Sequence, residues 1–150
     1  MKKYIIDGNN LIGKIKLLAS FQRKDKQASR DKLAFMIDRF FAAKKVEVYL
    51  HFDGFEGEKI NTQKLKIIYS EKSSADEKIK RQIEAEKNKR NLVVISSDNS
   101  IAGFAKVCGC EILSSENFGK ELYRSFSSES ENEKTDLAND VEEFKRLFNT

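Results

Sequence analysis

The sequence predicts an α/β protein with a mainly parallel central sheet and helices on both of its faces. Segments with the features of strands alternate with segments of helical spacing along most of the 150 residues, and such alternation favours parallel strands joined by helical crossovers. Residues 92–95 form a continuous apolar run, Leu-Val-Val-Ile, which is typical of a parallel strand covered on both faces. We expect the strands that begin at Lys3, Val46 and Leu92 to be central.

The first half of the chain supplies two of these strands. Residues 3–7 are apolar up to a terminal Asp7, and the segment from Val46 to Asp53 alternates with the period of two that strands show. Between them, apolar residues recur at helical spacing in two stretches that a polar, basic segment separates. The elements expected here are a strand at 3–7, a helix at 11–18, a loop at 21–27, a helix at 31–43 and a strand at 46–53.

The second half repeats the alternation. A patternless segment with two glycines is expected to form a loop on the same edge of the sheet as Asp53, and a glycine is expected to stop the helix before the last strand. The expected elements are a loop at 54–62, a strand at 65–69, helices at 73–90, 101–107 and 116–126, and strands at 92–95 and 110–113.

The last part of the chain differs in composition. Residues 127–135 are rich in serine and glutamate and have no apolar anchor, whereas apolar residues from Leu137 to Phe148 recur at helical spacing. We therefore divide the chain into a domain at 1–126 and an acidic linker with a C-terminal amphipathic helix at 127–150.

The composition favours a cytoplasmic protein that contacts no membrane. Hydrophobic residues make up 39% and charged residues 35%, and no apolar run approaches the roughly 20 residues of a membrane span. Met1-Lys2-Lys3 leads straight into a strand, without the pattern of a signal peptide. Cys108 and Cys110 are too few for a disulfide framework or a four-ligand zinc site, so we expect reduced thiols.

Basic residues are concentrated near the start. The net charge is +4, and residues 14–45 contain ten basic and three acidic side chains, whereas residues 127–143 contain seven acidic side chains and one lysine. A basic segment attracts phosphates, although lysine-rich helix faces are also common as simple solvated surface.

Four aspartates stand where parallel α/β sheets keep their ligand sites. Asp7, Asp53 and Asp98 each follow an apolar strand, and Asp76 begins a helix. Each also has a structural interpretation: a turn residue for Asp7 and Asp53, a helix N-cap for Asp98, and a first-turn acid for Asp76. The capping box Ser74 to Glu77 accounts for Glu77 better than for Asp76.

Together, the four acids favour a metal site. The carboxyl ends of parallel strands meet at one edge of a sheet, and the amide of Asn10 can turn back to the same pocket. Carboxylates that lie close together repel one another unless a cation sits among them. Mg²⁺ or Mn²⁺ suits oxygen ligands and can activate water for phosphodiester hydrolysis.

Other catalytic arrangements find less support. Asp7-Gly8-Asn9-Asn10 is not a glycine-rich phosphate loop, and a single histidine with no nucleophile elbow disfavours a hydrolase triad. That histidine, His51, stands two residues before Asp53. A structural role is the favoured interpretation, with orientation of a carboxylate or contact with substrate as the alternative.

The order of these motifs resembles the YacP-like NYN domains, a bacterial branch of the PIN-like nucleases. Ile5-Ile6-Asp7-Gly8-Asn9-Asn10-Leu11-Ile12 resembles their opening motif, and His51-Phe52-Asp53-Gly54 the second acidic motif. The segments 69–79 and 94–98 are similar to the third and fourth. The resemblance covers residues 3 to about 126, and the tail resembles the family's closing helix.

This resemblance implies a three-layer α/β/α PIN-like fold and a divalent-metal-dependent endoribonuclease. Its implied product ends are a 5′-phosphate and a 3′-hydroxyl. The implied catalytic residues are Asp7, Asp53, Asp76, Asp98 and Asn10, and the implied metal is Mg²⁺ or Mn²⁺, with Asp7, Asp76 and Asp98 as ligands. Apart from this implied set, Glu77, His51 and Ser97 are candidate accessory residues. Relatives often carry two adjacent aspartates where this chain has Asp76-Glu77, which leaves open which of the two faces the metal.

RNA is the partner that the resemblance implies, and presentation of that RNA within a larger ribonucleoprotein assembly stays open, as does the oligomeric state. Loss of one phosphate-binding residue should flatten the salt dependence of binding by about one unit. The candidates are Lys14, Lys16, Arg23, Lys24, Lys26 and Arg30.

Two rival classes remain. One is a module of the same fold that binds RNA or a ribonucleoprotein with a weak or inactive site. The other is a phosphoryl-accepting receiver domain, which is disfavoured because Asp7 is followed by Gly8 and Asn9 and not by a second acid, and because the last strand runs into Ser114-Ser115 and not into a lysine.

Overall fold

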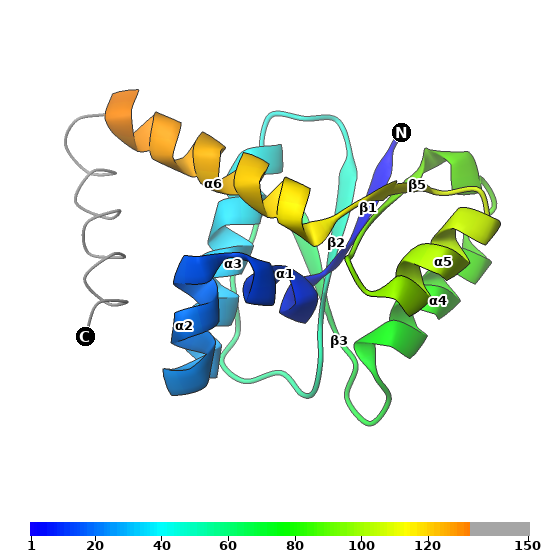
Figure 1. Ribbon diagram of the computed structural model, residues 1–150, viewed down its shortest axis with the longest axis horizontal. Helices are drawn as coiled ribbons and strands as arrows, with labels where there is room; N and C mark the ends of the chain where they lie inside the picture. The colour runs from blue at the N-terminus through cyan, green and yellow to red at the C-terminus, as the bar shows by residue number, and fades with distance from the viewer. Residues whose placement is uncertain (133–150) are drawn as a thin grey trace.

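A five-stranded parallel sheet lies between two layers of helices (Figure 1). The computed structural model describes residues 1–132. The strand order is β3-β2-β1-β4-β5, and every neighbouring pair is parallel. This confirms the predicted α/β/α class and the three predicted central strands. The strands are β1 (Lys3–Asp7), β2 (Glu47–Phe52), β3 (Leu65–Tyr69), β4 (Leu92–Ile95) and β5 (Glu111–Leu113).

The two helical layers bury alternate residues of the central strand. Ile5 and Ile6 are both fully buried but belong to different hydrophobic clusters, because successive side chains of a strand point to opposite faces. Ile6 packs with the layer that contains α1 (Gly8–Lys14), α2 (Lys16–Lys24), α3 (Lys26–Phe41) and α6 (Ser115–Asn132). Ile5 packs with the layer of α4 (Ala75–Ala85) and α5 (Asn99–Val107).

The loop predicted at 21–27 is wrong. The helix α2 continues to Lys24, and α3 begins at Lys26. Only Asp25 separates them, in an extended conformation, and its carboxylate accepts a hydrogen bond from the backbone N–H of Ala28 at 3.0 Å. A single N-cap aspartate is therefore enough to start a new helix, and the segment needs no loop.

The helix predicted at 73–90 is too long. Its start is confirmed, since the Ser74 hydroxyl accepts a hydrogen bond from the backbone N–H of Glu77 at 3.1 Å. The helix α4 ends at Ala85 because Glu86 is extended, and the Glu86 carboxylate lies 2.8 Å from Nζ of Lys3 on β1. A short 3₁₀ helix, η1 (Lys89–Asn91), then leads into β4.

The linker predicted at 127–135 is wrong at its beginning, because α6 continues to Asn132. The rest of that linker and the amphipathic helix predicted from Leu137 lie outside the described residues. No helix within 1–132 is long and apolar enough to cross a membrane.

The junction between β1 and α1 depends on a glycine. The strand ends at Asp7, and the helix begins at Gly8 without an intervening loop. A Cβ atom at Gly8 would lie 2.6 Å from the carbonyl oxygen of His51 and 2.8 Å from the Phe52 ring. Both groups belong to β2, so α1 can start this close to the neighbouring strand only because residue 8 has no side chain.

Gly8→Ala should therefore lower the free energy of unfolding by about 1–3 kcal/mol, the usual cost of overpacking. Urea denaturation would measure it. Gly13→Ala is the matched control, because Gly13 lies in the same helix and its Cβ would meet no heavy atom within 4 Å beyond its chain neighbours and the backbone of its own helix. That control should be neutral or stabilising by about 0.5–1 kcal/mol; equal effects of the two substitutions would contradict the close approach at Gly8.

Candidate active site

Asp7 ends the central strand and is buried, with 7% of its surface exposed. Its Oδ2 accepts a hydrogen bond from the Ser96 hydroxyl at 3.0 Å, and its carboxylate also accepts one from the backbone N–H of Asn10. Burial raises the pKa of Asp7 above its ordinary value, and the negative charges of Asp98 and Asp53 raise it further, although the two hydrogen bonds oppose these effects. The acids that follow three adjacent strands are thus electrostatically coupled.

Asp98 caps α5 and also adjoins Asp7. Its Oδ1 accepts hydrogen bonds from the backbone N–H groups of Ser100 and Ile101, at 2.9 and 3.1 Å. Its own N–H donates to the Ser96 hydroxyl at 3.1 Å, and that same hydroxyl donates to Asp7. The N-cap interpretation of Asp98 is therefore confirmed, and Ser96 joins this capping acid to the acid of the central strand.

Asp53 has a similar double position beyond the end of β2. Its Oδ1 accepts a hydrogen bond from the backbone N–H of Ala75 at 2.8 Å, at the start of α4, and one from the Ser70 hydroxyl at 3.4 Å. Its backbone N–H donates to Oδ1 of Asn9 at 2.8 Å. The acid thereby ties the ends of β2 and β3 to the first turn of α4.

Asp76 lies on the side of α4 that faces α5. Its Oδ1 lies 3.0 Å from Nζ of Lys80, and Lys80 donates to the Ser100 hydroxyl at 2.6 Å. Glu77 is exposed. Of the two adjacent acids, Asp76 is thus the one connected, through Lys80, with the helix that Asp98 caps.

Two successive amides hold the strand ends on either side of Asp7. Asn9 reaches the end of β2 through Asp53. Oδ1 of Asn10 accepts from the Ser97 backbone N–H at 2.9 Å and from the Ser115 hydroxyl at 2.7 Å, beyond the ends of β4 and β5. The sequence pointed to Asn10 but not to Asn9, Ser96 or Ser115. The only available signals were that Asn9 adjoins Asn10, that Ser96 directly follows β4, and that Ser115 lies two residues after β5.

A polar bridge links this edge of the sheet to α1 and α6. The Ser97 hydroxyl donates to Oε2 of Glu116 and accepts from the Ser115 backbone N–H at 2.8 Å. Nζ of Lys14 lies 3.2 Å from the other oxygen of Glu116. The hydrogen bond from Ser97 and the neighbouring Lys14 hold the pKa of Glu116 below its ordinary value. Ser97 and Lys14 are thus joined by an ionised carboxylate that the sequence did not single out.

The prediction that Arg30 contacts RNA is wrong, because Arg30 is buried with 4% of its surface exposed. Its guanidinium donates to the carbonyl oxygens of Asp53 and Phe55, at 2.6 and 3.0 Å, and lies over the rings of Phe52 and Tyr69. It holds the loop that follows β2. Its spacing from Leu33 and Ile37, three and seven residues on, was the available signal, since such residues share a helix face.

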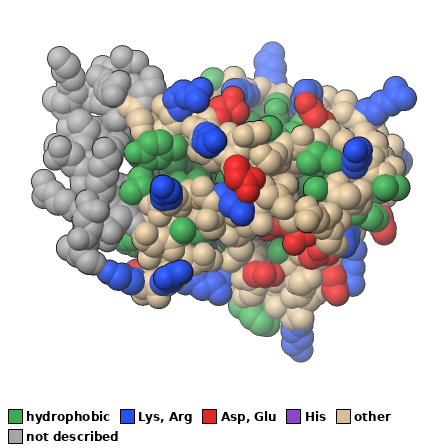
Figure 2. Space-filling model, viewed as in Figure 1, with side chains coloured by type: hydrophobic (Ala, Val, Ile, Leu, Met, Phe, Trp, Pro, Cys, Tyr) green, Lys and Arg blue, Asp and Glu red, His purple; other side chains and the backbone are tan. Residues whose placement is uncertain are grey.

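The other predicted RNA-binding residues are exposed. They lie on α1, on α2 and at the start of α3, and their contact with RNA stays a prediction. Figure 2 shows Lys and Arg side chains spread over the face that α1, α2 and α6 form, with hydrophobic side chains between them. The exposed residues are Lys14, Lys16, Arg23, Lys24 and Lys26.

His51 has the structural position that the sequence favoured. It is buried, and its Nε2 lies 2.7 Å from Oε1 of Gln82 on α4. Burial lowers the pKa of His51 below its ordinary value, so the ring is neutral near pH 7. It has no hydrogen bond to the four acids within residues 1–132.

The donor chemistry of this edge suits a divalent cation, but no complete cage is formed. Among the described residues, no group of three or more His, Cys, Asp or Glu side chains is arranged to hold a metal ion. Mg²⁺ is commonly held by one or two carboxylates, with water and substrate phosphates as further ligands. A cation beside Asp7 would also offset the burial and the neighbouring negative charges that raise the pKa of Asp7. The metal set of Asp7, Asp76 and Asp98 stays a prediction.

The chain is a parallel α/β/α sandwich with acids beyond the ends of its three central strands. The family model of the YacP-like NYN domain matches residues 4–148. The chain therefore belongs to the YacP-like NYN domain family, as the motifs predicted. The matched range crosses the predicted boundary at residue 126.

Solved structures show the same fold. The chain resembles the crystal structure of Rae1 (YacP) from Bacillus subtilis with a TM-score of 0.70 and 22% identity, over 99% of this chain and 95% of that one. For the W164L mutant of Rae1 (YacP) from the same organism the TM-score is 0.68 and the identity 18%, over 96% and 92%. A comparison with curated proteins finds no match.

Arg30→Ala should lower the free energy of unfolding by about 1–3 kcal/mol or more, because two carbonyl groups beside the core lose their donors. Urea denaturation would measure the loss. Lys26→Ala, an exposed basic residue of the same helix, should change stability by less than about 0.5 kcal/mol. If Arg30→Ala were as neutral as this control, the structural role of Arg30 would be disproved.

Asp7→Asn should stabilise the protein at neutral pH in the absence of metal. The folded state holds the Asp7 proton more tightly than the unfolded chain, so the stability due to Asp7 falls as pH rises through its raised pKa. Thermal unfolding should show a Tm a few degrees above that of the wild type at pH 7.5, with the gap narrowing toward pH 4.5. Glu111→Gln, which changes an exposed acid, is the control and should leave the Tm close to that of the wild type at both pH values. A Tm of Asp7→Asn below that of the wild type at pH 7.5 would contradict the prediction.

Proposed function

We propose that this chain is a divalent-metal-dependent endoribonuclease that hydrolyses RNA phosphodiester bonds at the carboxyl edge of its sheet. One observation carries the proposal: Asp7 is buried at the end of the central strand, and its pKa is raised by that burial and by the charges of Asp98 and Asp53, which follow the two adjacent strands. A buried carboxylate among like charges is costly. A purely structural role does not explain why an acid is kept in such a costly position, whereas binding of a cation and a substrate phosphate does.

The proposed ligands are Asp7, Asp76 and Asp98, with Asp53 and Asn10 completing the catalytic group. A bound Mg²⁺ or Mn²⁺ supplies an activated water and stabilises charge on the phosphate. The helix caps occupy Oδ1 of Asp98 and Oδ1 of Asp53. The second oxygen of each accepts no hydrogen bond within residues 1–132, so each acid retains one oxygen for this purpose.

The chain's own residues fix the orientation of these acids. The Ser96 hydroxyl donates to Oδ2 of Asp7 and accepts from the backbone of Asp98, so it sets the two carboxylates relative to each other. Asn10 holds the backbone of Ser97, directly before Asp98. Partners of this kind support metal affinity and activity in other metal sites.

RNA is the proposed substrate, and the exposed basic residues of α1, α2 and the start of α3 are proposed to hold its phosphates. Presentation of that RNA within a ribonucleoprotein assembly and a cytoplasmic location are parts of the same proposal. Cys108 and Cys110 are free thiols, which is compatible with a reducing compartment.

A second candidate is an RNA-binding module of the same fold without cleavage. The absence, among the described residues, of three acidic or other ligand side chains arranged around one point favours it. The two candidates make the same prediction for RNA binding and opposite predictions for metal binding and hydrolysis.

The test titrates Mn²⁺ and Mg²⁺ by calorimetry into wild type, into an Asp7→Asn, Asp98→Asn double variant, and into Glu111→Gln. Glu111→Gln is the control, because Glu111 is an exposed acid on β5 outside the site. The same samples are scored for cleavage of mixed cellular RNA. The double variant should lose metal binding and more than about 100-fold of the activity, because the loss of metal-ligand partners alone often costs about 10- to 100-fold.

The outcomes separate the candidates. Metal binding and cleavage that vanish together in the double variant, but persist in Glu111→Gln, support the nuclease. Wild-type protein that binds RNA, binds no metal even with RNA present, and does not cleave would instead establish the binding module.

A further inference from the structure

A groove lies where α6 crosses the junction of α1 and α2. Ile15 separates the two helices in an extended conformation. Gly119 of α6 lies against it, since a Cβ atom there would be 3.1 Å from Cγ1 of Ile15. The groove beside this crossing has a volume of about 410 Å³, within the usual range for ligand sites. It is lined by Lys14, Ile15, Lys16, Leu17, Gly119, Lys120 and Tyr123.

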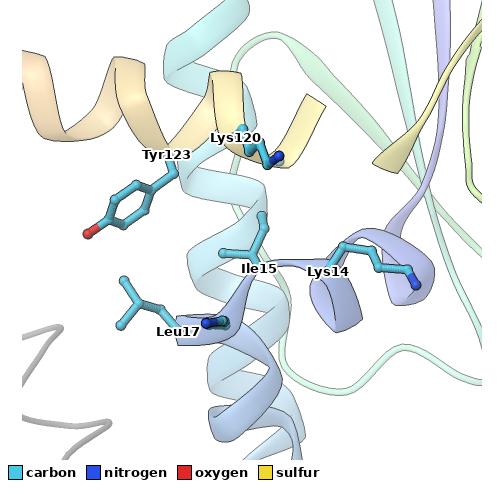
Figure 3. Close-up of a pocket in the computed structure, with 7 residues that line it drawn as sticks. Lys14, Ile15, Leu17, Lys120 and Tyr123 are labelled. Carbon is cyan, nitrogen blue, oxygen red and sulfur yellow. The ribbon is translucent and has the colours of Figure 1, made fainter. Parts of the chain in front are cut away.

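The lining combines an apolar floor with a basic rim. Ile15 is buried, Leu17 and Tyr123 are half-buried, and the three lysines are exposed. Figure 3 shows Leu17 and Tyr123 facing one another from α2 and α6 on one side of the groove, with Lys14 at the opposite end. No acidic residue is among the lining side chains of the described chain.

This composition fits unpaired nucleic acid. A base can stack on an aromatic ring that lies beside aliphatic side chains, and the surrounding lysines can bind the phosphates on either side of that base. A duplex satisfies only the second requirement, because its bases are already stacked and paired. The chemistry therefore favours a single strand.

Polar side chains link the groove to the acidic edge of the sheet. Lys14, at one end of the groove, pairs with Glu116, and Glu116 accepts a hydrogen bond from Ser97, the residue before Asp98. The chain Lys14–Glu116–Ser97 thus links the basic rim, through the start of α6, to the residue before Asp98. This link places the groove on the α6 side of the acids.

We propose that this groove binds an unpaired nucleotide adjacent to the scissile phosphodiester, with its base against Tyr123 and Leu17 and its phosphates at Lys16 and Lys120. The assignment rests on the proposed function for the identity of the ligand as RNA. It adds a requirement for single-stranded substrate on the α6 side of the cleavage site.

The test measures fluorescence anisotropy of a short, unstructured RNA oligonucleotide, and of a duplex with the same sequence, against the full chain. Tyr123→Leu should weaken single-strand binding by roughly 5- to 140-fold, since a stacked base contributes about 1–3 kcal/mol. Lys120→Gln should reduce the slope of log K against log salt by about 0.7. Lys106→Gln, an exposed lysine of α5 in the opposite layer, should leave both measurements unchanged.

Duplex binding should be insensitive to Tyr123→Leu. In cleavage assays Tyr123→Leu and Lys120→Gln should raise KM while kcat is retained. If the wild type cleaves RNA and both variants bind and cleave it equally well, the proposed role of the groove is overturned and the nuclease proposal stands. If the wild type neither cleaves nor binds metal but its RNA affinity depends on both residues, the groove stands and the nuclease proposal fails. RNA affinity that is independent of both substitutions overturns the inference.

Discussion

The close approach of α1 to β2 is the constraint on which the rest of this edge depends. Gly8 lets the helix begin directly after Asp7, with the His51 carbonyl where a side chain would otherwise lie. Because no loop intervenes, the next two residues fall in the first turn of the helix, above the ends of the neighbouring strands. Asn9 then reaches β2 on one side, and Asn10 reaches the loops after β4 and β5 on the other. The four-residue sequence Asp-Gly-Asn-Asn therefore positions the acid and also ties the ends of the neighbouring strands to the start of α1.

Burial of Asp7 opposes stability and supports the proposed chemistry for the same reason. The low polarity that raises its pKa also strengthens its attraction to any cation that replaces the proton. The hydrogen bonds from Ser96 and Asn10 limit the cost without removing it. An ionised carboxylate in this position destabilises the free protein. A bound divalent ion would remove that electrostatic cost, and this relief would add to the affinity for the ion.

The strands and the strand-end acids could be predicted because their signals are local. A buried parallel strand is a short apolar run. Asp7 and Asp53 follow such runs directly, and Asp98 follows one after two serines. The buried role of Arg30 depends on carbonyl oxygens more than 20 residues away, so a basic residue in a basic segment was mistaken for surface. The partner of Glu86, at the end of α4, is likewise distant in sequence, since Lys3 lies 83 residues away. Glu116, on the last described helix, meets Lys14 only after folding.

The structural and functional interpretations of the acids are compatible, because each interpretation needs a different oxygen. Asp98 caps α5, and Asp53 accepts the first N–H of α4, each through its Oδ1. A helix cap fixes the direction of the carboxylate and the position of the strand end at once. The remaining oxygen is thereby held at the edge of the sheet with little freedom, which is the condition that a precise metal or phosphate contact requires. Local sequence evidence could not choose between cap and ligand because one side chain can serve as both, and only the convergence of several strand ends distinguishes a site from a set of independent caps.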